Sequence, residues 1–181
     1  SLHEMRLDGG KMMYRLDPTD PGAGRTITTT AQVIDRMNEL EIPVFLEPLS
    51  VEKTDSGYKI LKDYATLIRD VSVGAALGDS TRNKWLKIPY CENYEQVTKA
   101  TTCPILMLGG AAAADPTGTI NAFINGMNTS PTVRGALVGR NVTFPQQEDP
   151  LAVATAIAGV IHGGHSVDQA LESMQNVRGK D

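Results

Sequence analysis

The run Trp85-Leu86-Lys87-Ile88-Pro89 is a short, mostly apolar segment that stops at a proline. Such a run is typical of a β-strand that is buried on both faces of a parallel sheet. Four further runs of this kind occur, at residues 11–16 (KMMYRL), 42–46 (IPVFL), 104–108 (PILML) and 133–138 (VRGALV). Together the runs predict a mainly parallel β-sheet.

Longer amphipathic segments separate these runs and predict helices. They lie at roughly residues 26–40, 60–77, 94–100, 117–127 and 150–161. Asp115-Pro116 and Asp149-Pro150 each place a capping residue before a proline, the order that is typical of a helix start. Strands that alternate with helices, without adjacent hairpin strands, predict a parallel α/β architecture.

Two architectures fit this alternation, an open doubly wound sheet and a (β/α)8 TIM barrel. The sequence has no G-x-G-x-x-G or G-x-x-x-x-G-K-[ST] loop, which favours the barrel. A complete barrel needs roughly 250 residues, whereas this chain has 181 and about five β-α units. We therefore predict that residues 1–181 form a single domain, the C-terminal portion of a TIM barrel whose N-terminal units are missing, with a terminal helix at about 166–177.

Composition restricts the partners of the chain. It has 17 basic and 21 acidic residues, a net charge of −4, which does not favour nucleic acid as a partner. No apolar run approaches the ~20 residues of a membrane span, so we expect no membrane partner and a cytoplasmic location. Two cysteines are too few for a disulfide framework. Because a partial barrel exposes sheet edges, we expect self-association into a homo-oligomer.

Lys87 is the first candidate for chemistry. An ammonium among Trp, Leu and Ile loses hydration, which favours the neutral, nucleophilic amine. A neutral amine on a rigid strand can form a Schiff base with a carbonyl group. The alternative is a lysine that reaches solvent or joins a salt bridge. Lys84, at the start of the same run, is expected to be solvated near the opposite end of the barrel.

Polar side chains also stand at the ends of the first two predicted strands. Tyr14 could transfer a proton, although alternation places it on the opposite face of its strand from Lys11 and Arg15. Lys11 or Arg15 would add positive charge near Lys87. Glu47 could be a general base or an ion-pair partner of Arg15, and both interpretations stay open.

Glycines follow the last two predicted strands. Gly109-Gly110 comes directly after one, and Gly139-Arg140 after the other. Backbone N–H groups in such turns can hold a phosphate, and an arginine can add a charged contact. The alternative is that these are ordinary turn residues.

The set WLKIPY (85–90), CPILMLGG (103–110) and VRGALVGRNVTF (133–144) resembles the sixth, seventh and eighth strands of the class I, Schiff-base aldolases of the DeoC/FbaB type. The segment LDGGKMMYRLDPTDPG (7–22) resembles still more closely the aldolase-like barrel proteins of bacterial inositol-catabolism clusters. The resemblance covers nearly the whole chain.

This resemblance implies a carbon–carbon lyase that cleaves a phosphorylated keto-sugar or sugar acid through a Schiff base on Lys87, in inositol or carbohydrate catabolism. It implies no metal and no other cofactor. Tyr14 is similar to the proton-transfer tyrosine of the fructose-bisphosphate branch. Four residues match the phosphate-binding loops: Gly109, Gly110, Gly139 and Arg140. Leu108 replaces the serine that often precedes these glycines, which removes one hydroxyl donor.

Other functions stay open at this point. A transferase of the thiolase or transaldolase type would use the same Schiff base, and product analysis with and without coenzyme A would separate it. A non-catalytic phosphosugar-binding barrel fragment would bind phosphate esters without forming an imine. A zinc-dependent aldolase is disfavoured, because His162 and His165 flank Gly163-Gly164 in the pattern of a helix end.

Overall fold

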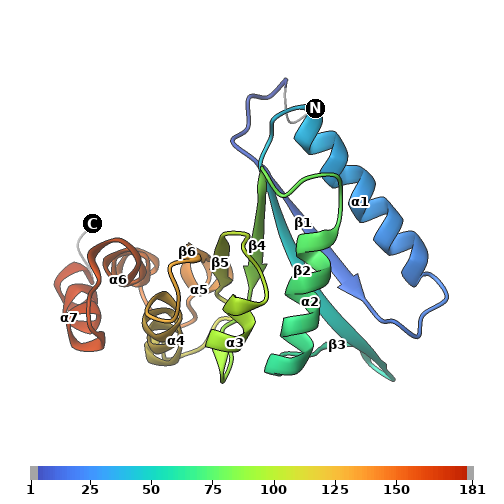
Figure 1. Cartoon of the computed structure of the whole chain (residues 1–181). Coiled ribbons are helices and arrows are strands. Elements are labelled where there is room, and N and C mark those ends of the chain that lie inside the picture. The colour runs from blue at the N-terminus through green and yellow to red at the C-terminus, as the bar shows by residue number, and fades with distance from the viewer. Residues whose placement is uncertain (1–3, 179–181) are drawn as a thin grey trace. The chain divides into compact units, whose positions relative to one another are not determined.

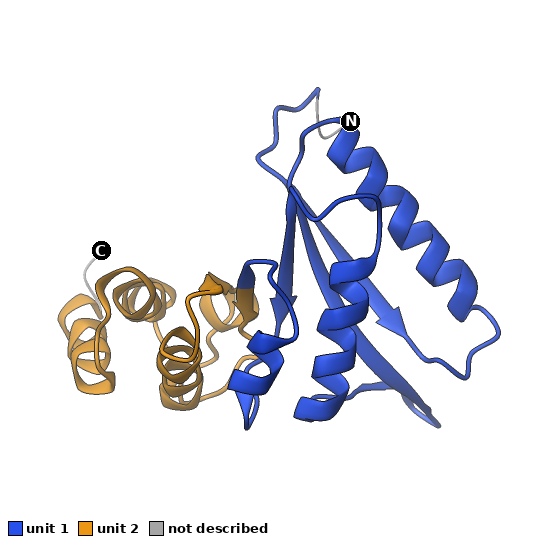
Figure 2. Cartoon of the chain, viewed as in Figure 1, with its two compact units in different colours: residues 1–105 blue, residues 106–181 orange. Residues whose placement is uncertain are grey.

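The structure is a computed structural model that describes residues 4–178. The chain divides into two compact units, residues 1–105 and residues 106–181, which Figure 2 colours separately. We call them the first unit and the second unit, and each is described by itself.

The first unit contains a parallel sheet with helices between its strands. Its elements are β1 (Gly10–Leu16), α1 (Ala23–Glu39), β2 (Val44–Thr54), β3 (Gly57–Ile60), α2 (Tyr64–Ala76), β4 (Lys84–Ile88) and α3 (Tyr94–Lys99) (Figure 1). The parallel strands lie in the order β1-β2-β4, so β2 is central. The predicted parallel β-α architecture is thereby confirmed in this unit.

Strand alternation gives the two faces of this sheet different roles. On one face, Leu46 and Leu86 are fully buried and α2 packs against β2. Gly74 makes this contact close, because an added Cβ would lie 3.0 Å from the Pro48 side chain. On the other face, the rings of Phe45 and Trp85 lie 6.1 Å apart. Lys11 and Arg15 of β1, Glu47 of β2 and Lys87 of β4 share this second face.

The chain after Ser50 forms an antiparallel hairpin, which the sequence pattern did not predict. β2 continues to Thr54, and β3 returns along it with Val51 opposite Ile60. The expectation of no hairpin strands is wrong at this point. The sequence pattern misses β3 because this strand has only four residues, of which the first three are exposed, and therefore contains no buried apolar run. The hairpin extends β2 beyond its last pairing with β1 at Ser50.

The second unit combines two short strands with four helices. They are β5 (Ile105–Leu108, whose first residue belongs to the first unit), α4 (Thr117–Met127), β6 (Val133–Leu137), α5 (Arg140–Thr143), α6 (Pro150–Gly163) and α7 (Val167–Val177). β5 and β6 are neighbours in the sheet. Helices α4, α6 and α7 pack together and bury Phe123, Val153 and Met174.

Capping residues set the starts of the last two helices, and the sequence indicates the first of them, whereas α4 has Pro116 at its N-cap position and no side-chain cap. The Asp149 side chain accepts a hydrogen bond from the Ala152 amide, and Pro150 is the first residue of α6. Ser166 and Gln169 form a reciprocal capping box at the start of α7. Within residues 4–178, no helix is long and apolar enough to cross a membrane.

Candidate active site

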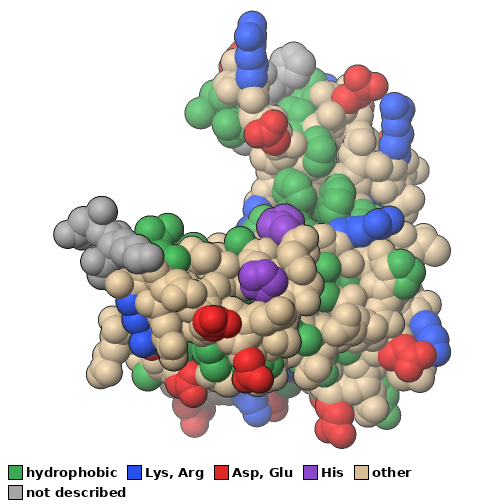
Figure 3. Space-filling model, turned by 90° about the vertical axis from the view of Figure 1, so that its left-hand side faces the viewer, with side chains coloured by type: hydrophobic (Ala, Val, Ile, Leu, Met, Phe, Trp, Pro, Cys, Tyr) green, Lys and Arg blue, Asp and Glu red, His purple; other side chains and the backbone are tan. Residues whose placement is uncertain are grey.

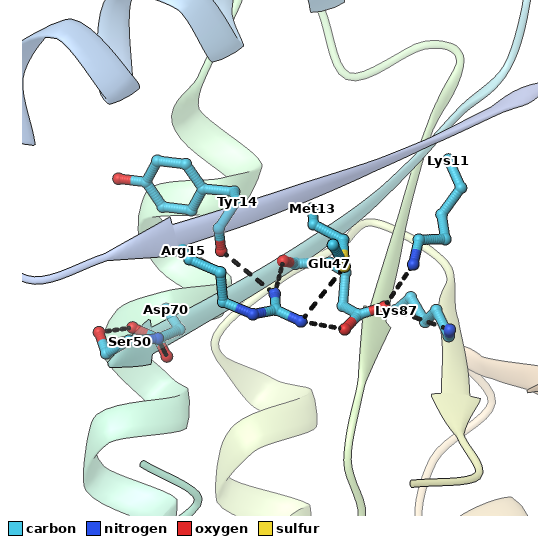
Figure 4. A network of polar contacts seen from close by, with 8 residues as sticks. All are labelled: Lys11, Met13, Tyr14, Arg15, Glu47, Ser50, Asp70 and Lys87. Atoms are coloured by element: carbon cyan, nitrogen blue, oxygen red, sulfur yellow. Dashed lines mark hydrogen bonds and ion pairs between the residues drawn. The ribbon is translucent and has the colours of Figure 1, made fainter. Parts of the chain in front are cut away.

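Four charged side chains meet on the sheet face that points away from α2. Three cations come from Lys11 and Arg15 on β1 and from Lys87 on β4, and they surround Glu47 on the central strand β2 (Figure 4). The Nζ atoms of Lys11 and Lys87 each lie 3.2 Å from Glu47 Oε2. Arg15 donates to Glu47 Oε1 and, at 2.9 Å, to the Glu47 backbone oxygen.

Glu47 is buried, and its ionisation depends on these partners. Burial alone raises the pKa of Glu47, but hydrogen bonds from Arg15 and Lys87 and the charges of both outweigh it, so the pKa lies below its usual range. The carboxyl group is therefore ionised at neutral pH. The sequence left two roles open for Glu47, a general base or an ion-pair partner of Arg15. The structure contains the ion pair with Arg15.

Lys87 occupies a confined position on β4. Its side chain is 13% exposed, whereas that of Lys11 on the same carboxylate is 38% exposed. It projects on the same face as Trp85, two residues earlier, and hence beside the Phe45–Trp85 ring pair. The low exposure of Lys87 and its contact with a buried carboxylate leave this amine little solvent.

The cluster carries a surplus of positive charge. Lys11, Arg15 and Lys87 contribute three positive charges against the one negative charge of Glu47, a net of +2. Because three of the four side chains are less than one-third exposed, solvent screens this charge incompletely. The face is therefore suited to an anionic molecule.

Tyr14 lies on the other face of β1, as strand alternation indicates, and is not brought to Lys87 (Figure 4). It is 2% exposed, and its hydroxyl has no hydrogen-bond partner among the described residues. Burial, and then the charge of Asp70, raise the pKa of Tyr14. Asp70 itself accepts hydrogen bonds from the backbone amide of Ser50 (2.7 Å) and from its hydroxyl (2.6 Å).

Lys84 is buried, and the expectation that it is solvated is wrong. It is 1% exposed, and its Nζ donates to the backbone oxygens of Leu77 and, at 2.8 Å, Ala75. These carbonyls belong to the end of α2, where helical partners run out. Burial lowers the pKa of Lys84. Both lysines of β4 are therefore largely shielded from solvent, on opposite faces of the strand. Lys84 donates to backbone carbonyls at the end of α2, whereas Lys87 pairs with Glu47.

The glycine loops of the second unit adjoin one another. The Asn141 side chain donates to the Gly109 backbone oxygen, which links the loop after β5 to the loop after β6. An added Cβ at Gly109 would lie 2.8 Å from Val138 Cγ1, so the loops meet too closely for a side chain. Gly110 has φ +73°, a left-handed conformation that favours glycine. Arg140 is exposed at the start of α5.

Among residues 4–178, the remaining nucleophiles and metal-binding side chains form no second cluster. Burial and the charges of Asp63 and Glu92 raise the pKa of Cys91 to about 11, so its thiol is protonated at neutral pH. No group of three or more His, Cys, Asp or Glu in the described part of the chain could hold a metal ion. On the face shown in Figure 3, exposed histidines appear and basic side chains are dispersed among acidic ones.

Sequence reasoning found Lys87 and Glu47, and it named Lys11 and Arg15 only as nearby charges. It missed that Lys11 and Lys87 share one oxygen of Glu47. The available signal is the i, i+4 spacing of Lys11 and Arg15, which places both on one strand face and brackets a single carboxylate on the next strand.

A family model described as Cgl0159-like matches residues 1–159. The chain belongs to the Cgl0159-like family. Among solved structures, Cgl0159 from Corynebacterium glutamicum is 28% identical, with a TM-score of 0.85 over 91% of this chain and 55% of that one. None of the curated proteins matches this chain.

The fold of this Cgl0159-like chain is also that of fructose-bisphosphate aldolases. The aldolase of Slackia heliotrinireducens is 16% identical, with a TM-score of 0.72 over 98% of this chain and 57% of that one. An archaeal fructose-1,6-bisphosphate aldolase, solved with its catalytic Lys covalently bound to the carbinolamine intermediate, is 18% identical, with a TM-score of 0.68 over 88% of this chain and 60% of that one. The chain thus spans little more than half the length of these structures, and it has an aldolase-like, partial TIM-barrel fold.

Proposed function

We propose that Lys87 is the Schiff-base lysine of a class I aldolase, which cleaves a carbon–carbon bond in a phosphorylated keto-sugar or sugar acid. The observation that carries this proposal is the pairing of a confined strand lysine with a buried carboxylate at 3.2 Å. The aldolase-like fold supports it, because carbonyl chemistry on a rigid strand suits that architecture.

The reaction begins with the amine of Lys87 in its neutral form. A proton leaves the ammonium through a water held by Glu47, and the nitrogen lone pair attacks the carbonyl carbon of the substrate. The product is a neutral carbinolamine. Its hydroxyl group takes up a proton and leaves as water, and the nitrogen becomes a positively charged iminium.

Glu47 serves as the counter-ion throughout this sequence. The iminium carries the same charge, at the same place, as the ammonium that Glu47 already pairs with at 3.2 Å. Because the carboxylate is buried and is held by Arg15, it is oriented before the charge forms. The low pKa of Glu47 means that its carboxylate does not retain the proton, which passes through the bridging water to bulk solvent.

Bond cleavage then uses the iminium as an electron sink. A base removes the proton from the hydroxyl group on the carbon β to the iminium carbon, and the carbon–carbon bond breaks to release an aldehyde. The bonding electrons enter the iminium and give an enamine. Protonation of the enamine at carbon, followed by addition of water, releases the second product and returns Lys87.

The loops of the second unit are a candidate site for phosphate. The backbone at Gly109, Gly110 and Gly139 is free of side chains, and the positive charge of Arg140 is exposed beside it. The closeness of the two loops, linked by Asn141, supports a role as one binding surface. We therefore propose that these loops bind the phosphate group of the substrate.

Trapping with borohydride tests the role of Lys87. A ketone phosphate such as dihydroxyacetone phosphate, followed by borohydride, converts an iminium into a stable secondary amine. We expect a mass gain on the peptide that contains Lys87, and loss of that gain in Lys87→Met. Peptide mapping by mass spectrometry measures both.

Lys11→Met is the matched control, because Lys11 contacts the same carboxylate oxygen at the same distance. This variant is expected to retain the adduct on Lys87. An adduct that maps to Lys11 in the parent protein, or one that persists undiminished in Lys87→Met, would remove the assignment.

A further inference from the structure

A cavity of about 410 Å³ lies in the first unit beside the charged cluster, and the proposed chemistry does not use it. Its apolar wall consists of Leu16 at the end of β1 and of Val51, Tyr58 and Ile60 from the β2–β3 hairpin. We propose that this cavity binds the uncharged, hydroxyl-bearing end of the substrate and selects against a second phosphate there. The inference rests on the proposed function and specifies its substrate class.

Arg15 connects the cavity to the reactive amine. Arg15 lines the cavity, and its guanidinium donates to the side chain and the backbone oxygen of Glu47. Glu47 in turn contacts Lys87. In this proposal, a molecule whose carbonyl carbon is bound to Lys87 extends past Arg15 into the cavity, of which Arg15 is the residue shared with the charged cluster. A volume of this size exceeds what a three-carbon ketone fills, and ligand sites in proteins commonly have such volumes.

The polar part of the lining accepts hydrogen bonds rather than attracting anions. Asp17, Asp20 and Thr26 lie here, in the loop after β1 and the first turn of α1. Hydrogen bonds from the Thr19 side chain and backbone lower the pKa of Asp17, so its carboxyl group is ionised at neutral pH. Asp20 accepts the Gly22 amide at 2.6 Å, which fixes its orientation.

The charge balance of this lining is opposite to that of the cluster. Two carboxylates, Asp17 and Asp20, and one guanidinium, that of Arg15, line the cavity, so the lining itself has no surplus of positive charge. A phosphate group would approach two carboxylates, one of which, Asp17, already interacts with the charge of Lys53. Sugar hydroxyl groups, in contrast, donate hydrogen bonds to carboxylates without a charge penalty.

Tyr58 gives independent support for a ligand in the cavity. It lies opposite Lys53 on the hairpin, and the residue is 60% exposed although its ring is large. An exposed aromatic residue on the wall of a cavity offers a flat apolar surface, and such surfaces commonly mark binding sites. The C–H faces of a sugar chain fit a wall of this kind while its hydroxyl groups reach the carboxylates.

Competition between three ketones in the borohydride experiment tests the inference in the full chain. Dihydroxyacetone phosphate is too short to fill the cavity, fructose 1-phosphate adds an uncharged hydroxylated end, and fructose 1,6-bisphosphate adds a phosphate to that end. For the parent protein we expect at least a fivefold higher adduct yield on Lys87 from fructose 1-phosphate than from the bisphosphate, at equal subsaturating concentrations.

Ala23→Trp tests the effect of the cavity's shape on adduct yield, with Ala76→Trp as its control, and Asp20→Asn tests the effect of the cavity's charge. Ala23→Trp places a ring in the cavity, and we expect the yield ratio of fructose 1-phosphate to dihydroxyacetone phosphate to fall at least tenfold. Ala76→Trp puts the same side chain on the exposed end of α2 and should keep the parent ratio. Asp20→Asn removes one charge but keeps an acceptor for Gly22, and should reduce the discrimination against the bisphosphate.

The outcomes distinguish this inference from the function on which it rests. An adduct on Lys87 with dihydroxyacetone phosphate, but with ratios unaffected by Ala23→Trp and Asp20→Asn, would overturn the cavity inference and uphold the Schiff-base function. A parent protein that prefers the bisphosphate would also overturn the inference. No adduct with any of the three ketones would overturn both.

Discussion

At the scale of single residues, Glu47 is the position on which the cluster depends. Two strands bring three cations to one carboxylate, so removing its charge leaves those cations to repel one another. Lys11 and Arg15 can turn towards solvent and relieve part of this cost, whereas Lys87 is more confined. Glu47 therefore contributes to the stability of the sheet as well as to the proposed chemistry.

We expect Glu47→Gln to lower the free energy of unfolding by about 2 kcal/mol at neutral pH, because buried charges lose their partner. The pKa of Glu47 is lower in the folded than in the unfolded state, so its contribution is fully present above the unfolded value of about 4.3 and is lost as the pH falls through the folded value. Urea denaturation from pH 3 to pH 7 measures this.

Glu52→Gln is the control, since Glu52 is an exposed residue on the same strand. It should change the free energy of unfolding by less than about 0.5 kcal/mol. A difference between the parent and Glu47→Gln that grows on acidification would contradict the expected sign.

At the scale of elements, the packing of α6 against the chain that follows it depends on a missing side chain. The ring of His165 lies over Gly159, where an added Cβ would approach His165 Cε1 to 2.8 Å. Gly164, with φ +64°, ends α6 and turns the chain so that His165 folds back. The histidine is thus a packing residue at a helix end.

The same substitution at two helical glycines should therefore have opposite effects. Gly159→Ala displaces the His165 ring, and we expect a loss of about 1–3 kcal/mol in the free energy of unfolding. Gly118→Ala, in α4, meets nothing within 4 Å and should gain up to about 1 kcal/mol from helix propensity. Chemical denaturation of both variants checks this, and equal effects would show that the ring does not lie over Gly159.

The elements also show what sequence could and could not predict. The run around Lys87 predicted β4 to within one residue at its start, because buried apolar runs and their breakers are local signals. The strand β3 was missed because its contacts lie across the hairpin, and the burial of Lys84 was missed because its partners are carbonyls of α2. The cavity has no sequence signature, since its wall joins residues from β1, β2, β3 and α1.

At the scale of the whole molecule, β1 lies at the edge of the described part of the sheet. Among the described strands, β1 pairs only with β2, whereas β2 pairs with both β1 and β4. An edge strand of this kind can pair with another chain. This is the physical basis for the proposal, made from the sequence, that the chain self-associates.

Hydrogen–deuterium exchange can compare the two strands directly. In dilute solution, we expect the amides of β1 to exchange faster than those of Val44–Leu46 on β2, because this part of β2 is paired with β1 on one side and with β4 on the other. Protection of β1 that rises with protein concentration would support self-association at this edge. Equal protection of both strands at every concentration would contradict an open edge.

The hairpin after Ser50 separates the wall of the proposed binding cavity from the strand segment that carries Glu47. It rises from the strand that carries Glu47, yet its turn at residues 55–56 lies beyond the last pairing of β2 with its parallel neighbour β1. Lengthening or shortening that turn would resize the cavity without moving the backbone beneath the reactive nitrogen. Under the proposed function, insertion or deletion at this one surface turn would change which molecules the cavity accepts and leave the strand positions of Glu47 and Lys87 as they are.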